Sequence, residues 1–148
     1  MGNKIPISVL VVIYTRHGEV LLLNRADHPG YWQSVTGSCD YLDEPLEQAA
    51  CREVKEETGL DCQRFELQNW HWQQVYEIYP HWRFRYPEGV IHNTEHVFGL
   101  CLPERQSIQL AEREHIDFVW LSIDEAAHQC FSETNRAAVL RIKEFLKN

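Results

Sequence analysis

Unbroken apolar runs and helically spaced apolar stripes divide this chain into two kinds of predicted element. Residues 6–14, with the sequence PISVLVVIY, form a β-branched apolar run that is typical of a buried strand. We expect further strands, beginning with a hairpin partner across the turn at Gly18, over residues 20–24, 31–36, 62–72, 73–86, 92–102 and 116–121. Helical spacing occurs in residues 45–58 and again in a C-terminal segment that opens at Ser132.

The C-terminal part of the chain supplies helices to cover the predicted sheet. Ser122 and Glu125 form a capping-box pattern, which predicts the start of a short helix. In the last helix we expect one apolar stripe to pack on the core: Ala138, Val139, Ile142, Phe145 and Leu146. Together the elements predict an α/β fold, an α/β/α sandwich with a mixed β-sheet, in a single domain over residues 1–148.

Composition and charge narrow the class of function without identifying it. The 148 residues are 44% hydrophobic and 24% charged, and the net charge is −8. We therefore expect neither nucleic acid nor a membrane surface as a partner. No apolar run has the length of a membrane span or the features of a signal peptide, so we expect a cytoplasmic protein. The five cysteines are scattered without a CxxC pair, which favours free thiols over a zinc site or a disulfide framework.

Residues 45–58 place a cluster of acids on one face of a helix. We expect Asp43 to cap this helix, Pro45 to lie in its first turn and Gly59 to end it. Glu53, Glu56 and Glu57 are spaced so that their carboxylates converge. Hard oxygen ligands of this kind suit Mg²⁺ or Mn²⁺. The alternative is a solvated acidic face with some Glu–Arg pairing.

The wider stretch, residues 37–60, resembles the Nudix box. Glu44 is followed by seven residues and then by REVKEETGL, which agrees with the box without a mismatch. Six residues rather than five separate Gly37 from Glu44, so the loop before the helix is one residue longer. The resemblance implies a pyrophosphohydrolase that depends on a divalent cation. In it Glu53 and Glu57 hold metal, and Glu56 is either a ligand or the base that orients water. Arg52 is expected to align a carboxylate of the helix through a bidentate pair.

Nearly the whole chain is similar to one Nudix subgroup, the bacterial dihydroneopterin triphosphate pyrophosphatases. The matching stretches are PISVLVVIY, WQSVTGS, RYPEGVIHNTEH, EHIDFVWL and the Asn135-Arg136 pair. This resemblance implies that Glu114 completes the metal site. It also implies a set of substrate-binding residues: Lys4, Arg25, Thr36, Tyr76, Glu77, Ile78, Tyr79 and Ser132.

The subgroup resemblance implies Mg²⁺-dependent hydrolysis of dihydroneopterin triphosphate to dihydroneopterin monophosphate and pyrophosphate, a step of folate biosynthesis. The alternatives are a broad nucleoside triphosphate pyrophosphohydrolase and a non-catalytic Nudix-like domain that binds nucleotides. The expected partner is a small-molecule triphosphate, and a monomer is favoured over an oligomer. Five aromatic residues are close in sequence and could either pack on the sheet or stack on a flat ring: Trp70, Trp72, Tyr76, Tyr79 and Trp82.

Overall fold

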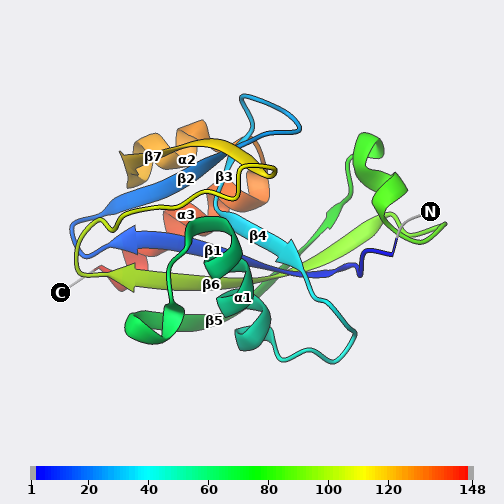
Figure 1. Cartoon of the computed structure of the whole chain (residues 1–148), viewed down its shortest axis with the longest axis horizontal. Helices are drawn as coiled ribbons and strands as arrows, with labels where there is room; N and C mark the ends of the chain where they lie inside the picture. The colour runs from blue at the N-terminus through cyan, green and yellow to red at the C-terminus, as the bar shows by residue number, and fades with distance from the viewer. Residues whose placement is uncertain (1–2, 147–148) are drawn as a thin grey trace.

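A seven-stranded sheet with helices on both faces organises residues 3–146, the part of the chain that this computed structural model describes (Figure 1). The strands are β1 (Ile7–Thr15), β2 (Glu19–Arg25), β3 (Trp32–Gln33), β4 (Val35–Ser38), β5 (Glu66–Glu77), β6 (His92–Leu102) and β7 (His115–Ser122). The helices are α1 (Leu46–Thr58), α2 (Ile123–Gln129) and α3 (Glu133–Phe145), with short 3₁₀ helices η1 (Cys62–Arg64) and η2 (Pro80–Arg85). Each helix within residues 3–146 is too short or too polar to cross a membrane.

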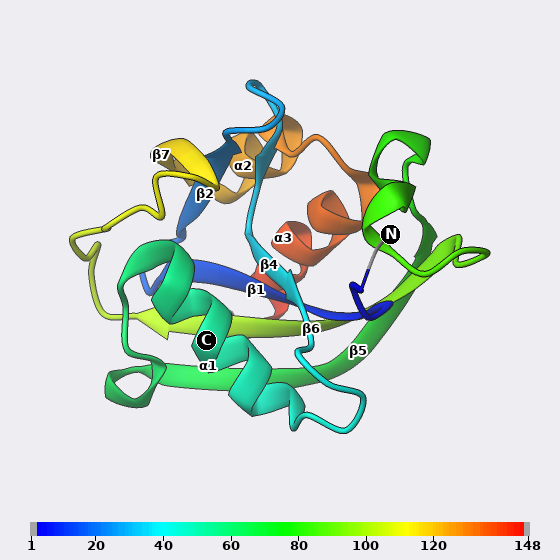
Figure 2. The ribbon, with the colours of Figure 1, turned by 45° about the vertical axis from the view of Figure 1, so that its right-hand side comes forward.

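Strand β1 lies at the centre of the molecule and is buried on both faces. It runs parallel to β6 along its whole length and antiparallel to β4. Val9 and Val11 face a core shared with α1, whereas Leu10 and Val12 face a second core shared with α2 and α3. Figure 2 shows α1 on one side of β1 and α3 on the other. This arrangement explains the unbroken apolar run and confirms the predicted α/β/α sandwich with a mixed sheet.

The predicted hairpin between the first two strands is present, but the two strands pair only over a short stretch. Strand β2 meets β1 only next to the turn, where Tyr14 pairs with Val20. Its main neighbour is β7, with which it pairs from Glu19 to Arg25. Because β2 is apolar on both faces, it can pack inside the protein without lying along β1. The pairing with β7 places Arg25 opposite His115, at the end of the sheet where several acids gather.

The segment between residues 62 and 86 also differs from prediction. One strand, β5, replaces the two strands expected over residues 62–72 and 73–86. A bulge at residues 69–72 keeps β5 continuous, and His71 there has a positive φ of 50° while its amide N–H donates to the Asn69 side chain. Pro80 then begins the 3₁₀ helix η2, where its missing N–H costs nothing. The strand predicted over residues 31–36 is likewise split, into β3 and β4.

The ends of the helices follow most, but not all, of the sequence signals. Gly59 adopts the left-handed conformation that ends α1, and Ser122 and Ser132 cap α2 and α3 as predicted. The predicted cap at Asp43 is wrong, because α1 begins at Leu46 and Pro45 occupies the cap position. Phe145 is 41% exposed rather than buried in the predicted stripe, and its ring stacks on Trp70.

Candidate active site

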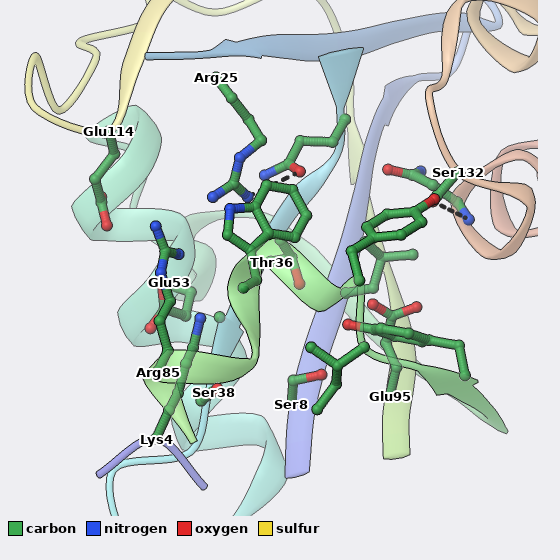
Figure 3. Close-up of a pocket in the computed structure, with 18 of the residues that line it drawn as sticks. Lys4, Ser8, Arg25, Thr36, Ser38, Glu53, Arg85, Glu95, Glu114 and Ser132 are labelled. Carbon is green, nitrogen blue, oxygen red and sulfur yellow. Dashed lines mark hydrogen bonds between the residues drawn. The ribbon is translucent and has the colours of Figure 1, made fainter. Parts of the chain in front are cut away.

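One cavity of about 660 Å³ lies at the end of the sheet beside α1 and η2, and Figure 3 shows part of its lining. All the residues predicted for catalysis, metal or substrate line it: Lys4, Arg25, Thr36, Glu53, Glu56, Glu57, Tyr76, Glu77, Ile78, Tyr79, Glu114 and Ser132. These residues come from segments more than 120 positions apart in sequence, and the fold brings them to one surface. The volume is in the range of small-molecule sites.

The acidic end of the cavity, formed by Glu53, Glu56, Glu57 and Glu114, is built mainly on α1. Glu53 and Glu57 are 7% and 2% exposed, and they are neighbours on one face of the helix. Burial raises the pKa of Glu57 well above its usual value, and the adjacent Glu53 and then Glu114 raise it further. Burial also raises the pKa of Glu53. Glu56 differs, because its side chain is 51% exposed at the same cavity.

The glycine of the box is explained by a close approach between β4 and α1. A Cβ atom on Gly37 would lie 2.1 Å from the Cδ atom of Glu53, so a side chain there would have to displace the Glu53 carboxylate. The missing side chain lets the Glu53 carboxylate lie directly against the strand. Gly37 therefore leaves the space that the Glu53 carboxylate occupies.

The box glutamate before the helix, Glu44, has a structural role in this fold. It is 5% exposed, and its carboxylate accepts hydrogen bonds from the Asp40 amide at 2.7 Å and from Arg52 at 3.0 and 3.3 Å. Arg52 also donates to Glu53 at 2.5 Å. The bidentate partner of Arg52 is thus Glu44 rather than a carboxylate of α1, and Arg52 links the loop to Glu53. The loop with its extra residue still delivers Glu44 to this link.

Glu114 reaches the acidic end from the turn that precedes β7. The main-chain carbonyl of Glu114 accepts a hydrogen bond from the Ala26 amide at 2.9 Å, which holds this turn against the end of β2. The next residue, His115, is buried, and its Nε2 atom lies 3.8 Å from Glu57 Oε1. Burial and the nearby Arg25 lower the pKa of His115 to about 4. His115 is therefore neutral near pH 7, and its contact with Glu57 is not an ion pair.

A cluster of three cations, Lys4, Arg25 and Arg85, lies next to the acidic end (Figure 3). Arg25 forms a bidentate pair with Asp27, both distances being 2.8 Å, and Arg85 contacts the same carboxylate at 2.9 Å. These contacts hold the pKa of Asp27 well below its usual range. Burial lowers the pKa of Lys4, as do Arg85 and Arg25, while Glu53 and Glu57 oppose the change. The cluster provides local attraction for an anion although the whole chain carries −8.

Next to these cations the cavity carries an aromatic wall formed by Tyr76, Tyr79, Trp82 and Phe131. The rings of Tyr79, Trp82 and Phe131 lie 5.7 to 6.1 Å from one another, and the Arg25 guanidinium lies 4.3 Å from the Trp82 ring. Trp70 instead packs in the second core. The five predicted aromatic residues therefore divide, because Trp70 and Trp72 pack on the sheet while the other three line the cavity.

Several predicted substrate neighbours already have partners inside the protein. The Thr36 hydroxyl donates to the Val9 carbonyl at 3.0 Å, and the Ser132 hydroxyl accepts from the Asn135 amide as the cap of α3. Glu77 pairs with Arg83. The sequence-based prediction missed Ser8, Arg85, Glu95 and Phe131, which line the cavity as well. The matching stretch RYPEGVIHNTEH contains Arg85 and Glu95 and was the available signal for both.

The donor set at the acidic end fits a divalent cation. Within residues 3–146 no three Asp, Glu, His or Cys side chains are already gathered as a formed metal cluster. However, Glu57 Oε1 is buried without a hydrogen-bond partner among these residues, and Glu53 and Glu114 supply further carboxylate oxygens at the same cavity. Hard oxygen donors of this kind prefer Mg²⁺, Mn²⁺ or Ca²⁺. Three acids near one another with an unpaired oxygen are therefore suited to such a cation.

Comparison with known proteins agrees with this site. Residues 4–142 match the NUDIX domain. The chain is 43% identical to the dihydroneopterin triphosphate diphosphatase of Escherichia coli K12 over 139 residues, which cover 92% of this chain and 91% of that protein. It is 40% identical to the enzyme of the same name from Haemophilus influenzae, over 95% of this chain and 87% of that one.

A solved structure agrees as well. That of the E. coli dihydroneopterin triphosphate pyrophosphohydrolase superposes with a TM-score of 0.88 at 41% identity, covering 95% of this chain and 97% of that chain. Nudix hydrolases generally use divalent metal ions, which suits the carboxylates at the acidic end. The fold, the box on α1 and the match over residues 4–142 have one explanation: the chain belongs to the Nudix family.

Proposed function

We propose that this chain hydrolyses dihydroneopterin triphosphate to dihydroneopterin monophosphate and pyrophosphate, with Mg²⁺ as its cofactor. The observation that carries the proposal is a single cavity that joins an acidic end and three cations to an aromatic wall. A triphosphate attached to a flat ring needs both parts. The relatives that match nearly the whole chain are named for this substrate, and the reaction belongs to folate biosynthesis as the resemblance implies.

Glu53, Glu57 and Glu114 are the residues that would hold the cation, and Mn²⁺ suits the same oxygen donors. When bound, the cation supplies positive charge beside the phosphate oxygens, where charge accumulates during phosphoryl transfer. Lys4, Arg25 and Arg85 bind and orient the phosphate chain, and the planar guanidinium groups suit phosphate oxygens geometrically.

Among the acids of α1, we assign the general base to Glu56. Its carboxylate is about half exposed at the cavity, and its distance to Arg52 is 3.9 Å, so it is free to accept a proton from water. The water oxygen forms a bond to phosphorus while the bridging P–O bond between the α- and β-phosphates breaks. The electron pair of that bond stays on the bridging oxygen, so the products are dihydroneopterin monophosphate and pyrophosphate, and Glu56 holds the proton.

The test measures products and metal dependence in wild type and in Glu57→Gln. Phosphorus NMR should show one pyrophosphate per dihydroneopterin monophosphate, and removal of Mg²⁺ with EDTA should stop the reaction. Glu57→Gln keeps the size of the side chain but removes a ligand charge, so kcat/KM should fall at least ~10³-fold, or about 4 kcal/mol.

The matched control is Glu104→Gln, an exposed glutamate outside the cavity, which should change kcat/KM by less than ~2-fold. Near-normal activity of Glu57→Gln at saturating Mg²⁺, or stepwise release of orthophosphate from wild type, would contradict the proposal.

A further inference from the structure

Glu95 is a buried carboxylate in the cavity that the proposed reaction does not use. It lies on β6, is 4% exposed and lines the cavity. Figure 3 shows it on the opposite side of the cavity from Glu114, beyond Ser8. Among residues 3–146, its Oε1 atom has no hydrogen-bond partner and no lysine, arginine or histidine forms an ion pair with it. A buried, unpaired acid is costly to folding and calls for an explanation.

The surroundings of Glu95 are fixed by hydrogen bonds. The Asn93 side chain, two positions earlier on the same face of β6, donates to Ser8 Oγ at 2.7 Å and to Tyr76 Oη at 3.0 Å. Ser8 and Tyr76 line the cavity, and Ser8 is also the neighbour of Glu95 across the β1–β6 pair. Glu95 therefore belongs to a rigid polar floor, next to the aromatic wall that suits a flat ring.

We propose that Glu95 recognises the ring of the substrate, by accepting hydrogen bonds from a ring N–H and the adjacent exocyclic amino group. This inference rests on the proposed function for the location of the triphosphate, which the acidic end and the cations hold at the other side of the cavity. A carboxylate has two oxygens that can accept from two adjacent donors in a bidentate pair.

The chemistry of the pairing selects one class of ring. The 2-amino-4-oxopyrimidine edge, which pterins share with guanine, presents an N–H donor next to an amino group. The corresponding edge of adenine presents an amino group next to an acceptor nitrogen, which would face a carboxylate oxygen unfavourably. A buried acceptor left without a donor penalises the wrong ring more than an apolar pocket would. Glu95 should therefore favour pterin and guanine triphosphates over adenine triphosphates.

The test compares wild type with Glu95→Gln on three substrates: dihydroneopterin triphosphate, dGTP and dATP. The glutamine keeps the shape but replaces one acceptor oxygen by a donor NH₂ group. We expect kcat/KM to fall at least ~30-fold for the first two substrates, mainly through KM, and to change less than ~3-fold for dATP. Neopterin, which has the ring without phosphates, should bind at least ~10-fold more weakly, as measured by quenching of its fluorescence.

Two further variants separate recognition from structure. Glu66→Gln changes an exposed glutamate of β5 outside the cavity and should leave all three substrates and neopterin binding unchanged. Glu95→Asp keeps the charge and should retain more of the preference for dGTP over dATP than Glu95→Gln does. Circular dichroism of each variant checks that it is folded.

The inference is overturned by equal losses for dGTP and dATP, or by an unchanged dGTP to dATP ratio together with unchanged neopterin binding. These results are independent of the proposed function. That proposal is judged on wild type with dihydroneopterin triphosphate, whereas the role of Glu95 is judged on the change in ring preference between variant and wild type.

Discussion

At the scale of single residues, the acidic end places negative charge where water is largely excluded. Glu57 is 2% exposed beside Glu53, and the negative charge of Glu114 further raises the pKa of Glu57. Ionising both buried carboxylates without a cation is unfavourable, because each lacks the solvation that water provides. A divalent cation offsets this cost, so the acids that destabilise the metal-free protein are the ones suited to bind metal.

Glu114 is the acid whose role depends most on the fold, because it reaches the site from outside the box. If it completes the metal site, Glu114→Ala should raise the Mg²⁺ concentration for half-maximal rate by ~10-fold and lower the maximal rate. A Mg²⁺ titration of activity measures both quantities. Glu112→Ala, two residues away and outside the cavity, is the control. If Glu114→Ala shows the same Mg²⁺ dependence as wild type, Glu114 does not bind the metal and is an ordinary surface acid.

Glu95 predicts a pH-dependent change in stability. Burial raises its pKa in the folded protein to about 7, above the ordinary value of 4.5. The unfolded chain releases this proton at lower pH, so stability is lost as the pH rises from 4.5 towards 7. The glutamine of Glu95→Gln does not titrate. Near pH 8 the variant should therefore unfold at a higher temperature than wild type, and its free energy of unfolding should be larger by roughly 3 kcal/mol at most.

Calorimetric scans of both proteins without metal or ligand measure this effect. The difference in Tm should shrink towards zero near pH 4, where Glu95 is protonated in both the folded and the unfolded states. The same difference in Tm at both pH values would contradict an ionised, buried Glu95. If the prediction holds, Glu95→Gln is more stable than wild type near pH 8 and less selective for the ring, which is the trade-off expected of a binding residue.

At the scale of elements, the contact between β4 and α1 determines the position of the acidic end. Gly37 allows this contact, and Arg52 connects the loop glutamate Glu44 to Glu53. The order of strand, loop and acidic helix could be predicted from the sequence, because residues 37–60 are contiguous and the glutamates follow the spacing of a helix. The N-terminus of α1 could not, since Pro45 occupies the cap position and Glu44 accepts the Asp40 amide within the loop.

Gly37→Ala tests this contact directly. The added Cβ would meet the Glu53 carboxylate, so either the helix or the side chain must move. We expect a loss of about 2 kcal/mol in stability and at least ~10-fold in kcat/KM. Urea unfolding and steady-state kinetics measure the two effects. In Glu53→Ala the clash is absent, so adding Gly37→Ala to that background should cost much less stability; an equal cost would show that the contact is not the cause.

The connection from β5 to η2 shows where local pattern fails. Residues 73–86 are rich in β-forming aromatics, and this composition predicted a strand throughout. Pro80 instead starts a 3₁₀ helix that carries Trp82 and Arg85 into the cavity. The β-propensity of such residues reflects packing against neighbouring strands. Here Trp82 and Arg85 instead line the cavity, and the Lys4 amide donates a hydrogen bond to the Arg85 carbonyl at 2.9 Å.

At the scale of the whole molecule, the cavity is assembled from both halves of the sheet, α1, η2 and the start of α3. Similarity to the subgroup predicted nine residues that line this cavity, Glu114 and the eight substrate neighbours, although local pattern gave a reason only for the aromatic ones. Glu95 lies in the matching stretch RYPEGVIHNTEH, but local pattern did not single it out, because a glutamate in a strand is usually exposed. Its burial follows only from the parallel pairing of β1 and β6.

We propose above that this Nudix chain acts on a pterin triphosphate. The most direct measurement is kcat/KM for dihydroneopterin triphosphate, dGTP, 8-oxo-dGTP and dATP at one Mg²⁺ concentration and one pH. We expect dihydroneopterin triphosphate to be preferred by at least ~10-fold, about 1.4 kcal/mol, with the purine triphosphates next among the common nucleotides. A higher kcat/KM for dATP or 8-oxo-dGTP would contradict the pterin assignment while leaving membership of the Nudix family intact.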